Sequence, residues 1–280
     1  MTPAFVLIGF ALFAAPPSPY QAFFPANAEA HFVMNVDSPA LQGRSFAFDV
    51  SADGQPFLAS QNTFYPVGAR ADRMLPPFRV AGLSSIEQFA FMRDGALLAI
   101  SGKTLFAVTP EGGRALAALP EEKMRVAAGS AKDAYLVGGA SVFTLSQGGA
   151  VEHLLRAPKD IDALASDGSR LVIACGQAIL ELKDTGAPRL VAALPEPVRS
   201  LAIAPDGALF YSTAAGVGYV SARGGLYPFV NGKGAQLRVS GESLFLFFED
   251  EGILKVSPAE SFADLARSID AARGQQDGGR

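Results

Sequence analysis

Residues 197–225, PVRSLAIAPDGALFYSTAAGVGYVSARGG, contain the pattern that decides the fold. Alternating apolar residues precede Asp206-Gly207, an apolar run follows this pair, a second apolar strand begins at Val217, and a glycine pair ends the stretch. Asp-Gly between two apolar segments is a strong β-hairpin signal, because glycine accepts the positive φ that a tight turn requires. The stretch therefore predicts short antiparallel strands joined by turns, without a helix.

The same pattern recurs along the chain. Asp-Gly pairs in the same context begin at Asp53, Asp94 and Asp167, and degraded copies lie at 127–138 and 238–248. The strands that follow the hairpins begin at residues 105, 142, 179, 217 and 253, so they recur every 36–38 residues, and a looser copy begins at residue 63. Most copies continue into a glycine turn and a fourth apolar stretch that ends in proline. Four-stranded units at this spacing are typical of a β-propeller.

The number of copies predicts six blades. The sixth copy supplies only three strands, through Val256, and a blade that lacks its outer strand would leave an unpaired edge and an open ring. The stretch His31–Val36 alternates like a strand and precedes the first complete unit. We therefore predict an all-β, six-bladed propeller over residues 31–256, closed by this N-terminal strand.

Composition and charge exclude several classes of protein. The chain has 280 residues, of which 49% are hydrophobic and 18% charged, so it is too apolar to be intrinsically disordered. A net charge of -4 argues against a nucleic-acid binder, which needs a basic surface. The single cysteine excludes an intramolecular disulfide framework and a zinc–thiolate cluster.

The N-terminal residues 1–30 are predicted to be a signal peptide or an N-terminal anchor. Ala4–Ala15 is an uncharged apolar run, shorter than the roughly 20 residues that span a bilayer. Small-x-small sites end at Ala28 and Ala30, where cleavage could occur. An uncleaved anchor, or a start codon assigned too far downstream, remains open. A periplasmic or secreted bacterial protein is expected, with membrane contact only through this segment if it is uncleaved.

The C-terminal stretch departs from the repeat. Ser257-Pro258-Ala259-Glu260 reads as a capping box with proline at the first helical position. Four apolar residues at helical spacing follow; they are Phe262, Leu265, Ala266 and Ile269. We therefore predict an amphipathic helix over 257–272 and a disordered tail over 273–280. The helix either packs against the propeller rim or docks on a partner.

The repeat in residues 197–225 resembles repeats of the NHL type and of the gluconolactonase, or senescence-marker, family of six-bladed propellers. The resemblance covers residues 45–256 as a pattern and supports the fold more than an activity. It implies a divalent cation at the centre of the ring, held by a glutamate, two asparagines and an aspartate, with the asparagines near the starts of inner strands. The corresponding stretch here, Val198–Leu201, has no asparagine, and only Asn231 lies on a loop that leads into an inner strand.

The family's metal-ligand pattern is therefore not matched, and we expect no metal, no cofactor and no catalytic residues of that kind. His31 and His153 fall on predicted outer strands, away from the axis of the ring. The glycine pairs are turns between strands and not phosphate cradles, because no helix follows them.

One set of charged residues remains as a candidate ligand-binding ring at the channel mouth. Alignment of the repeats places five charged side chains near the starts of inner strands, and they are Glu87, Arg125, Asp160, Arg199 and Lys233, with Gln236 beside the last of them. They form either an ion-pair collar between adjacent blades or a site for a polar ligand or peptide. In the second case Arg125 and Arg199 hold an anion.

These observations favour an exported, non-enzymatic propeller that acts as a protein-interaction or scaffold module with an unidentified protein partner. The alternative is a lactonase-like hydrolase, or a small-ligand-binding propeller, with its site at the mouth of the central channel. Metal analysis and lactone turnover distinguish the scaffold from the hydrolase.

Overall fold

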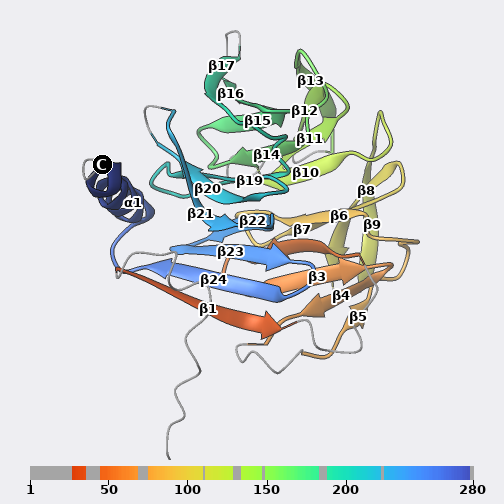
Figure 1. The fold of residues 1–280 in the computed structure, drawn as a ribbon. Helices are drawn as coiled ribbons and strands as arrows, with labels where there is room; N and C mark the ends of the chain where they lie inside the picture. The colour runs from red at the N-terminus through yellow and green to blue at the C-terminus, as the bar shows by residue number, and fades with distance from the viewer. Residues whose placement is uncertain are drawn as a thin grey trace, which may run out of the picture.

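The structure is a computed structural model that describes residues 27–35, 45–68, 75–109, 111–128, 134–146, 149–182, 188–221 and 224–277. The described residues form six four-stranded antiparallel sheets arranged in a ring, with one C-terminal helix (Figure 1). The predicted signal peptide or anchor lies almost entirely outside the described residues.

Each sheet is one blade, and its first strand lies innermost. Blade 1 contains β2 (Ala47–Val50), β3 (Pro56–Ser60), β4 (Thr63–Pro66) and β5 (Phe78–Arg79). Blade 2 contains β6 (Gln88–Phe91), β7 (Leu97–Ser101), β8 (Thr104–Thr109) and β9 (Gly112–Ala118). Blade 3 contains β10 (Arg125–Ala128), β11 (Ala134–Gly138), β12 (Ser141–Leu145) and β13 (Val151–Arg156).

The second half of the ring repeats this order. Blade 4 contains β14 (Ala163–Ser166), β15 (Leu171–Cys175), β16 (Ala178–Leu182) and β17 (Arg189–Ala193). Blade 5 contains β18 (Ser200–Ile203), β19 (Leu209–Ser212), β20 (Gly216–Val220) and β21 (Leu226–Asn231). Blade 6 contains β22 (Gln236–Ser240), β23 (Ser243–Phe248), β24 (Gly252–Pro258) and, as its outer strand, β1 (Ala28–Asn35).

The ring closes as the repeat count predicts. β1 pairs antiparallel with β24, and Ala30 lies opposite Val256 in this pairing. The N-terminal strand therefore completes the blade that the end of the repeat leaves one strand short, which confirms the predicted closure. β1 begins at Ala28, three residues before the predicted start of the strand.

The Asp-Gly pairs form the turns that join inner strands to second strands. Gly207 has a φ of 87°, and the carboxylate of Asp206 accepts a hydrogen bond from the amide of Ala208 at 3.1 Å. The aspartate thus stabilises the turn locally while the glycine supplies its left-handed backbone conformation.

The core lies between neighbouring blades. Blades 1 and 6 meet through aromatic side chains, with the rings of Phe48 and Phe247 5.3 Å apart. Blades 4 and 5 meet through smaller aliphatic residues such as Val172 and Leu201. Each fully buried side chain of this size contributes about 1.5–3 kcal/mol of hydrophobic stabilisation, so packing between blades supports the ring.

The C-terminal helix α1 (Phe262–Asp277) starts later than the predicted capping box and continues beyond Ala272. Ser257 and Pro258 remain in β24, where they pair with β1. The N-cap is instead Ser261, whose hydroxyl accepts a hydrogen bond from the amide of Asp264 at 3.0 Å. A serine N-cap therefore starts the helix, but one turn further along the chain than predicted.

α1 packs on the ring. Phe262, Leu265 and Ala266 are buried in the apolar cluster of blades 5 and 6, and the ring of Phe262 lies 5.3 Å from that of Phe210. The first turn is also held by Asp206, whose carboxylate accepts a hydrogen bond from the amide of Ala263 at 2.6 Å. In the described part of the chain, no helix has the length and hydropathy that a membrane crossing requires.

Candidate functional site

The inner strands of all six blades line a central cavity of about 390 Å³, the channel. A second cavity of about 380 Å³ adjoins it, since Gln88, Arg125, Gln236 and Arg238 line both. The second cavity adds Glu87 and lies at the residues where inner strands begin, so we call it the channel mouth.

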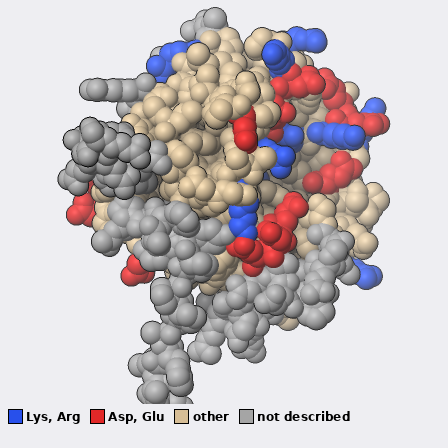
Figure 2. Space-filling view, viewed as in Figure 1, with Lys and Arg blue, Asp and Glu red and all other residues tan. Residues whose placement is uncertain are grey.

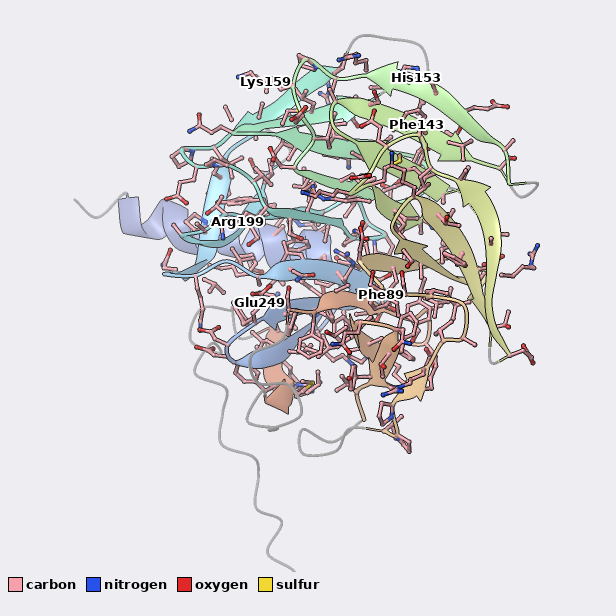
Figure 3. All side chains as sticks on the ribbon, turned by 90° about the vertical axis from the view of Figure 1, so that its right-hand side faces the viewer. Phe89, Phe143, His153, Lys159, Arg199 and Glu249 are labelled. Carbon is pink, nitrogen blue, oxygen red and sulfur yellow. The ribbon has the colours of Figure 1, made fainter. Side chains whose placement is uncertain are left out.

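The channel mouth and α1 lie on opposite faces of the ring. α1 contacts Asp206, in the turn that follows β18, whereas Arg199 immediately precedes β18. Figure 3 views the ring from the side away from α1. Charged side chains of both signs gather toward that side in Figure 2. A ligand that enters at the channel mouth therefore meets a polar, mixed-charge surface.

The third residue of each inner strand distinguishes two blades from the other four. In register, this residue is alanine in blades 2 to 5, and the four positions are Ala90, Ala127, Ala165 and Ala202. In blade 1 it is Asp49 and in blade 6 it is Arg238. Because blades 1 and 6 are neighbours in the closed ring, the two charges meet, with Arg238 Nε 2.8 Å from Asp49 Oδ1.

Asp49 links three blades. Its second carboxylate oxygen accepts a hydrogen bond from the amide of Phe91, in blade 2, at 2.7 Å. Burial raises the pKa of Asp49 above its ordinary value, and the opposing effects of Arg238 and the backbone amides do not cancel that rise. The channel wall therefore contains a carboxylate that takes up a proton more readily than an exposed aspartate.

Arg125 begins β10 and is half-buried in the wall of the channel. Its guanidinium donates a hydrogen bond to the carbonyl of Ile161 at 3.3 Å. Burial lowers the pKa of Arg125, and the nearby carboxylate of Asp162 opposes this shift. Arginine nevertheless stays protonated in proteins, so Arg125 brings a positive charge to the wall.

Arg199 is the most accessible of the channel arginines. Its backbone amide donates to the carbonyl of Ser212 at 2.7 Å, which fixes the residue at the start of β18. The side chain is exposed and lines the channel, and it forms no ion pair with any residue in the described ranges. Its guanidinium is therefore available to a ligand.

The structure brings together three of the five charged residues singled out from the sequence. Arg125 and Arg199 line the channel, and Glu87 lines the channel mouth, where its carboxylate accepts a hydrogen bond from the amide of Gly102 at 2.9 Å. Gln236 also lies at the channel mouth and donates to the carbonyl of Phe46 at 3.2 Å.

Asp160 and Lys233 do not line either cavity. Lys233 pairs with Glu251 and with Asp250, and its ammonium lies 5.3 Å from the centre of the Phe248 ring. It therefore belongs to a local cluster on blade 6.

Polar contacts between adjacent blades are formed largely by residues outside the predicted ring. The side chain of Gln88 accepts the amide of Val126 at 3.0 Å, between blades 2 and 3. The hydroxyl of Ser200 accepts the amide of Leu237 at 2.9 Å, between blades 5 and 6. Of the five predicted charged residues, Arg125 makes such a contact, toward blade 4, and the neighbouring Gln236 makes one toward blade 1.

Sequence reasoning missed Asp49, Asp162 and Arg238. Asp162 immediately precedes β14, and its carboxylate accepts the amide of Gly176 at 2.6 Å. Alignment by strand position would have identified Asp49 and Arg238, because four of the six blades have alanine there. Alignment on the Asp-Gly turns could not place Arg238, because the turn after β22 has no Asp-Gly pair.

Other chemistry-bearing residues lie away from the channel. His31 is in β1 and His153 in β13, both outer strands, and the His153 ring lies 5.4 Å from that of Phe143. Burial raises the pKa of the Cys175 thiol, which makes it a poor nucleophile. Within the described ranges, no group of three or more His, Cys, Asp or Glu residues is placed to hold a metal ion.

Comparisons with known proteins identify the fold through structure alone. No family model matches the chain, and no curated protein matches its sequence. A gluconolactonase from Xanthomonas campestris is similar, with a TM-score of 0.64 and 12% identity over 85% of this chain and 92% of that one.

Two further solved structures are similar to this chain. An aldose sugar dehydrogenase from Streptomyces coelicolor, bound to PQQ, has a TM-score of 0.65 and 14% identity over 84% of this chain and 99% of that one. A virginiamycin B lyase from Staphylococcus aureus has a TM-score of 0.58 and 10% identity over 82% of this chain and 99% of that one. The chain is a six-bladed β-propeller whose structural neighbours include gluconolactonases.

Proposed function

We propose that this propeller binds a small organic anion in its central channel and that Arg199 and Arg125 hold the anionic group. The observation that carries the proposal is the exposed Arg199 guanidinium, without an ion-pair partner among the described residues, on the wall of a cavity of about 390 Å³. A guanidinium binds carboxylate through two parallel hydrogen bonds, which makes arginine well suited to this ligand class.

The size and lining of the channel support a small ligand. Cavities that bind small molecules in proteins have volumes of about 300–1,000 Å³. Besides the charged groups, the wall presents polar side chains of Gln88, Ser166 and Ser200. These groups suit a ligand that combines one anionic group with hydroxyls.

Calorimetric titration of the purified protein with gluconate and with sulfate tests the proposal. Arg199→Ala should weaken binding about tenfold or more, the loss of roughly 1.4 kcal/mol or more, without a change in Tm. Lys159→Ala is the matched control, because Lys159 is exposed just before β14 but does not line the channel (Figure 3). Equal affinity of wild type and Arg199→Ala, or no binding of either anion, would overturn the proposal.

A lactonase-like hydrolase is the competing function for the same channel. It predicts stoichiometric calcium or zinc in the purified protein and turnover of gluconolactone. Both results together would replace the binding function with a catalytic one. Turnover that survives removal of Arg199 would in addition place the reaction away from this arginine.

A second candidate is a protein-interaction module. Leu154 on β13 is 45% exposed and Leu190 on β17 is 59% exposed, and both are on outer strands of the neighbouring blades 3 and 4. Outer strands present unpaired backbone groups to which an extended segment of another protein can add. A partner that binds wild type and Arg199→Ala but not a Leu154→Asp, Leu190→Asp variant would support this function.

We propose further that the protein is periplasmic or secreted, because residues 1–30 have the pattern of a signal peptide or an N-terminal anchor. Cell fractionation tests this, with export expected to depend on residues 1–30. Retention of the full chain in the cytoplasm would remove this part of the proposal.

A further inference from the structure

Arg238 is a third arginine of the channel, and its positive charge is partly neutralised by an ion pair with Asp49. Its side chain lines both the channel and the channel mouth and is 27% exposed. Nε donates to Asp49, and Nη1 donates to the carbonyl of Leu237 at 2.7 Å. The second contact holds the guanidinium at the wall independently of Asp49.

We propose that Asp49 and Arg238 form a proton-controlled switch in the channel, so that protonation of Asp49 releases the charge of Arg238 to a bound anion. The inference rests on the proposed function, because it concerns the affinity of the same site. Its consequence is that anion binding and proton uptake are coupled.

The surroundings of Asp49 identify it as the group that changes charge. From β22 it faces Arg238, and from β6 it faces the backbone amide of Phe91. β3, which pairs with β2, carries no titratable side chain. The other charged groups of the channel wall are Arg125, Asp162 and Arg199.

The charges of the wall explain the direction of the coupling. The channel is lined by three arginines and two aspartates, so the wall has a net charge of one positive unit while Asp49 is ionised. Protonation of Asp49 adds a second positive unit beside the ligand. A bound anion in turn disfavours the ionised carboxylate, because like charges in a partly buried site repel each other strongly.

Thermodynamic linkage requires that protonation of Asp49 and anion binding strengthen each other by the same factor. If protonation of Asp49 raises the affinity for the anion by some factor, the anion raises the proton affinity of Asp49 by the same factor. Burial already raises the pKa of Asp49, so the rise in affinity should occur above the pH range in which exposed aspartates titrate. Affinity therefore increases as the pH falls through the pKa of Asp49.

Sulfate is the probe for this inference, because it keeps its charge over the pH range of interest. Wild type should bind sulfate more tightly as the pH falls through the pKa of Asp49, by about tenfold in total, within the usual range of coupling between two sites. Calorimetry in buffers of different ionisation enthalpy should detect net proton uptake on binding.

Two substitutions test the two members of the pair separately. Asp49→Asn imitates the protonated state and should bind tightly at both pH values, without proton uptake through position 49. Arg238→Gln removes the released charge and should bind weakly at both. Glu181→Gln is the matched control, since Glu181 is a buried, arginine-paired carboxylate that lines neither cavity, and this variant should keep the wild-type pH dependence.

The outcomes separate the two proposals. If sulfate binds but Asp49→Asn and Arg238→Gln retain the wild-type pH dependence, the switch is wrong and the channel site stands. If neither sulfate nor gluconate binds at any pH, the proposed function itself fails. Circular dichroism at the titration temperature checks that each variant is folded, including Arg238→Gln, whose Tm should fall.

Discussion

The pKa values of two buried carboxylates in this propeller shift in opposite directions. Asp49, in the channel wall between blades 1 and 6, is 7% exposed, and Glu181, on β16 of blade 4, is 6% exposed. Burial raises the pKa of both, but at Glu181 the hydrogen bonds and charges of Arg189 and Arg170 outweigh it, and the pKa falls below its ordinary value.

The number of partners accounts for this difference. Glu181 receives hydrogen bonds from Arg189 Nε at 2.9 Å and from Arg170 Nε at 3.0 Å. Asp49 pairs with a single arginine, Arg238, whose side chain also lines the channel. Similar burial therefore accompanies a lowered pKa at Glu181 in blade 4 and a raised pKa at Asp49 in the channel.

The largest expected effect is the loss of Arg238. Arg238→Gln should destabilise the fold by roughly 3 kcal/mol at neutral pH, because it leaves Asp49 as a buried charge without a cation. Arg189→Gln should cost about 1 kcal/mol or less, since Arg189 is largely exposed and Arg170 still pairs with Glu181. Urea unfolding measures both values. Equal losses in the two variants would contradict the contrast between the sites.

An intermediate effect is expected for the blade 4 carboxylate. Glu181→Gln should cost about 2 kcal/mol at neutral pH through the loss of charge-assisted hydrogen bonds. Because the folded pKa of Glu181 is depressed, its contribution is present above the pKa of the unfolded chain and is lost as the pH falls through the lower folded pKa. Unfolding over a pH series should show wild type and variant converge in acid. A constant difference would contradict this.

The smallest effect is expected for Asp49→Asn, within about 1 kcal/mol of wild type at neutral pH. The folded pKa of Asp49 is raised, so the folded state binds this proton more readily than the unfolded chain does. Wild type should therefore gain stability relative to the variant as the pH falls through the folded pKa, opposite in sign to Glu181. The same pH series measures this. If wild type instead gained stability relative to the variant as the pH rises, the effect of Arg238 on the pKa of Asp49 would exceed that of burial.

The blades and the closure of the ring could be predicted because they follow from local sequence patterns. The recurrence of strands such as that at Val217 indicated six four-stranded units, and the missing outer strand of blade 6 pointed to closure near His31. The start of α1 was misplaced by one turn. Two candidate N-cap serines, Ser257 and Ser261, follow each other there, and pairing with β1 keeps Ser257 in a strand.

The candidate site was only partly predictable. Arg125, Arg199 and Glu87 were found because strand starts can be located from the repeat. Lys233 looked equivalent but pairs with Glu251 beside it, and loop geometry of this kind has no periodic signature.

By itself the sequence determined a ring of six antiparallel units, because alternating apolar residues and Asp-Gly turns act within about 40 residues of one another. Only the tertiary structure decided that Asp49 and Arg238, 189 residues apart, share a hydrogen bond in the channel. Ring closure brings the first and last blades into contact. Burial and a single cation then set the charge state of Asp49, and neither can be read from a local pattern.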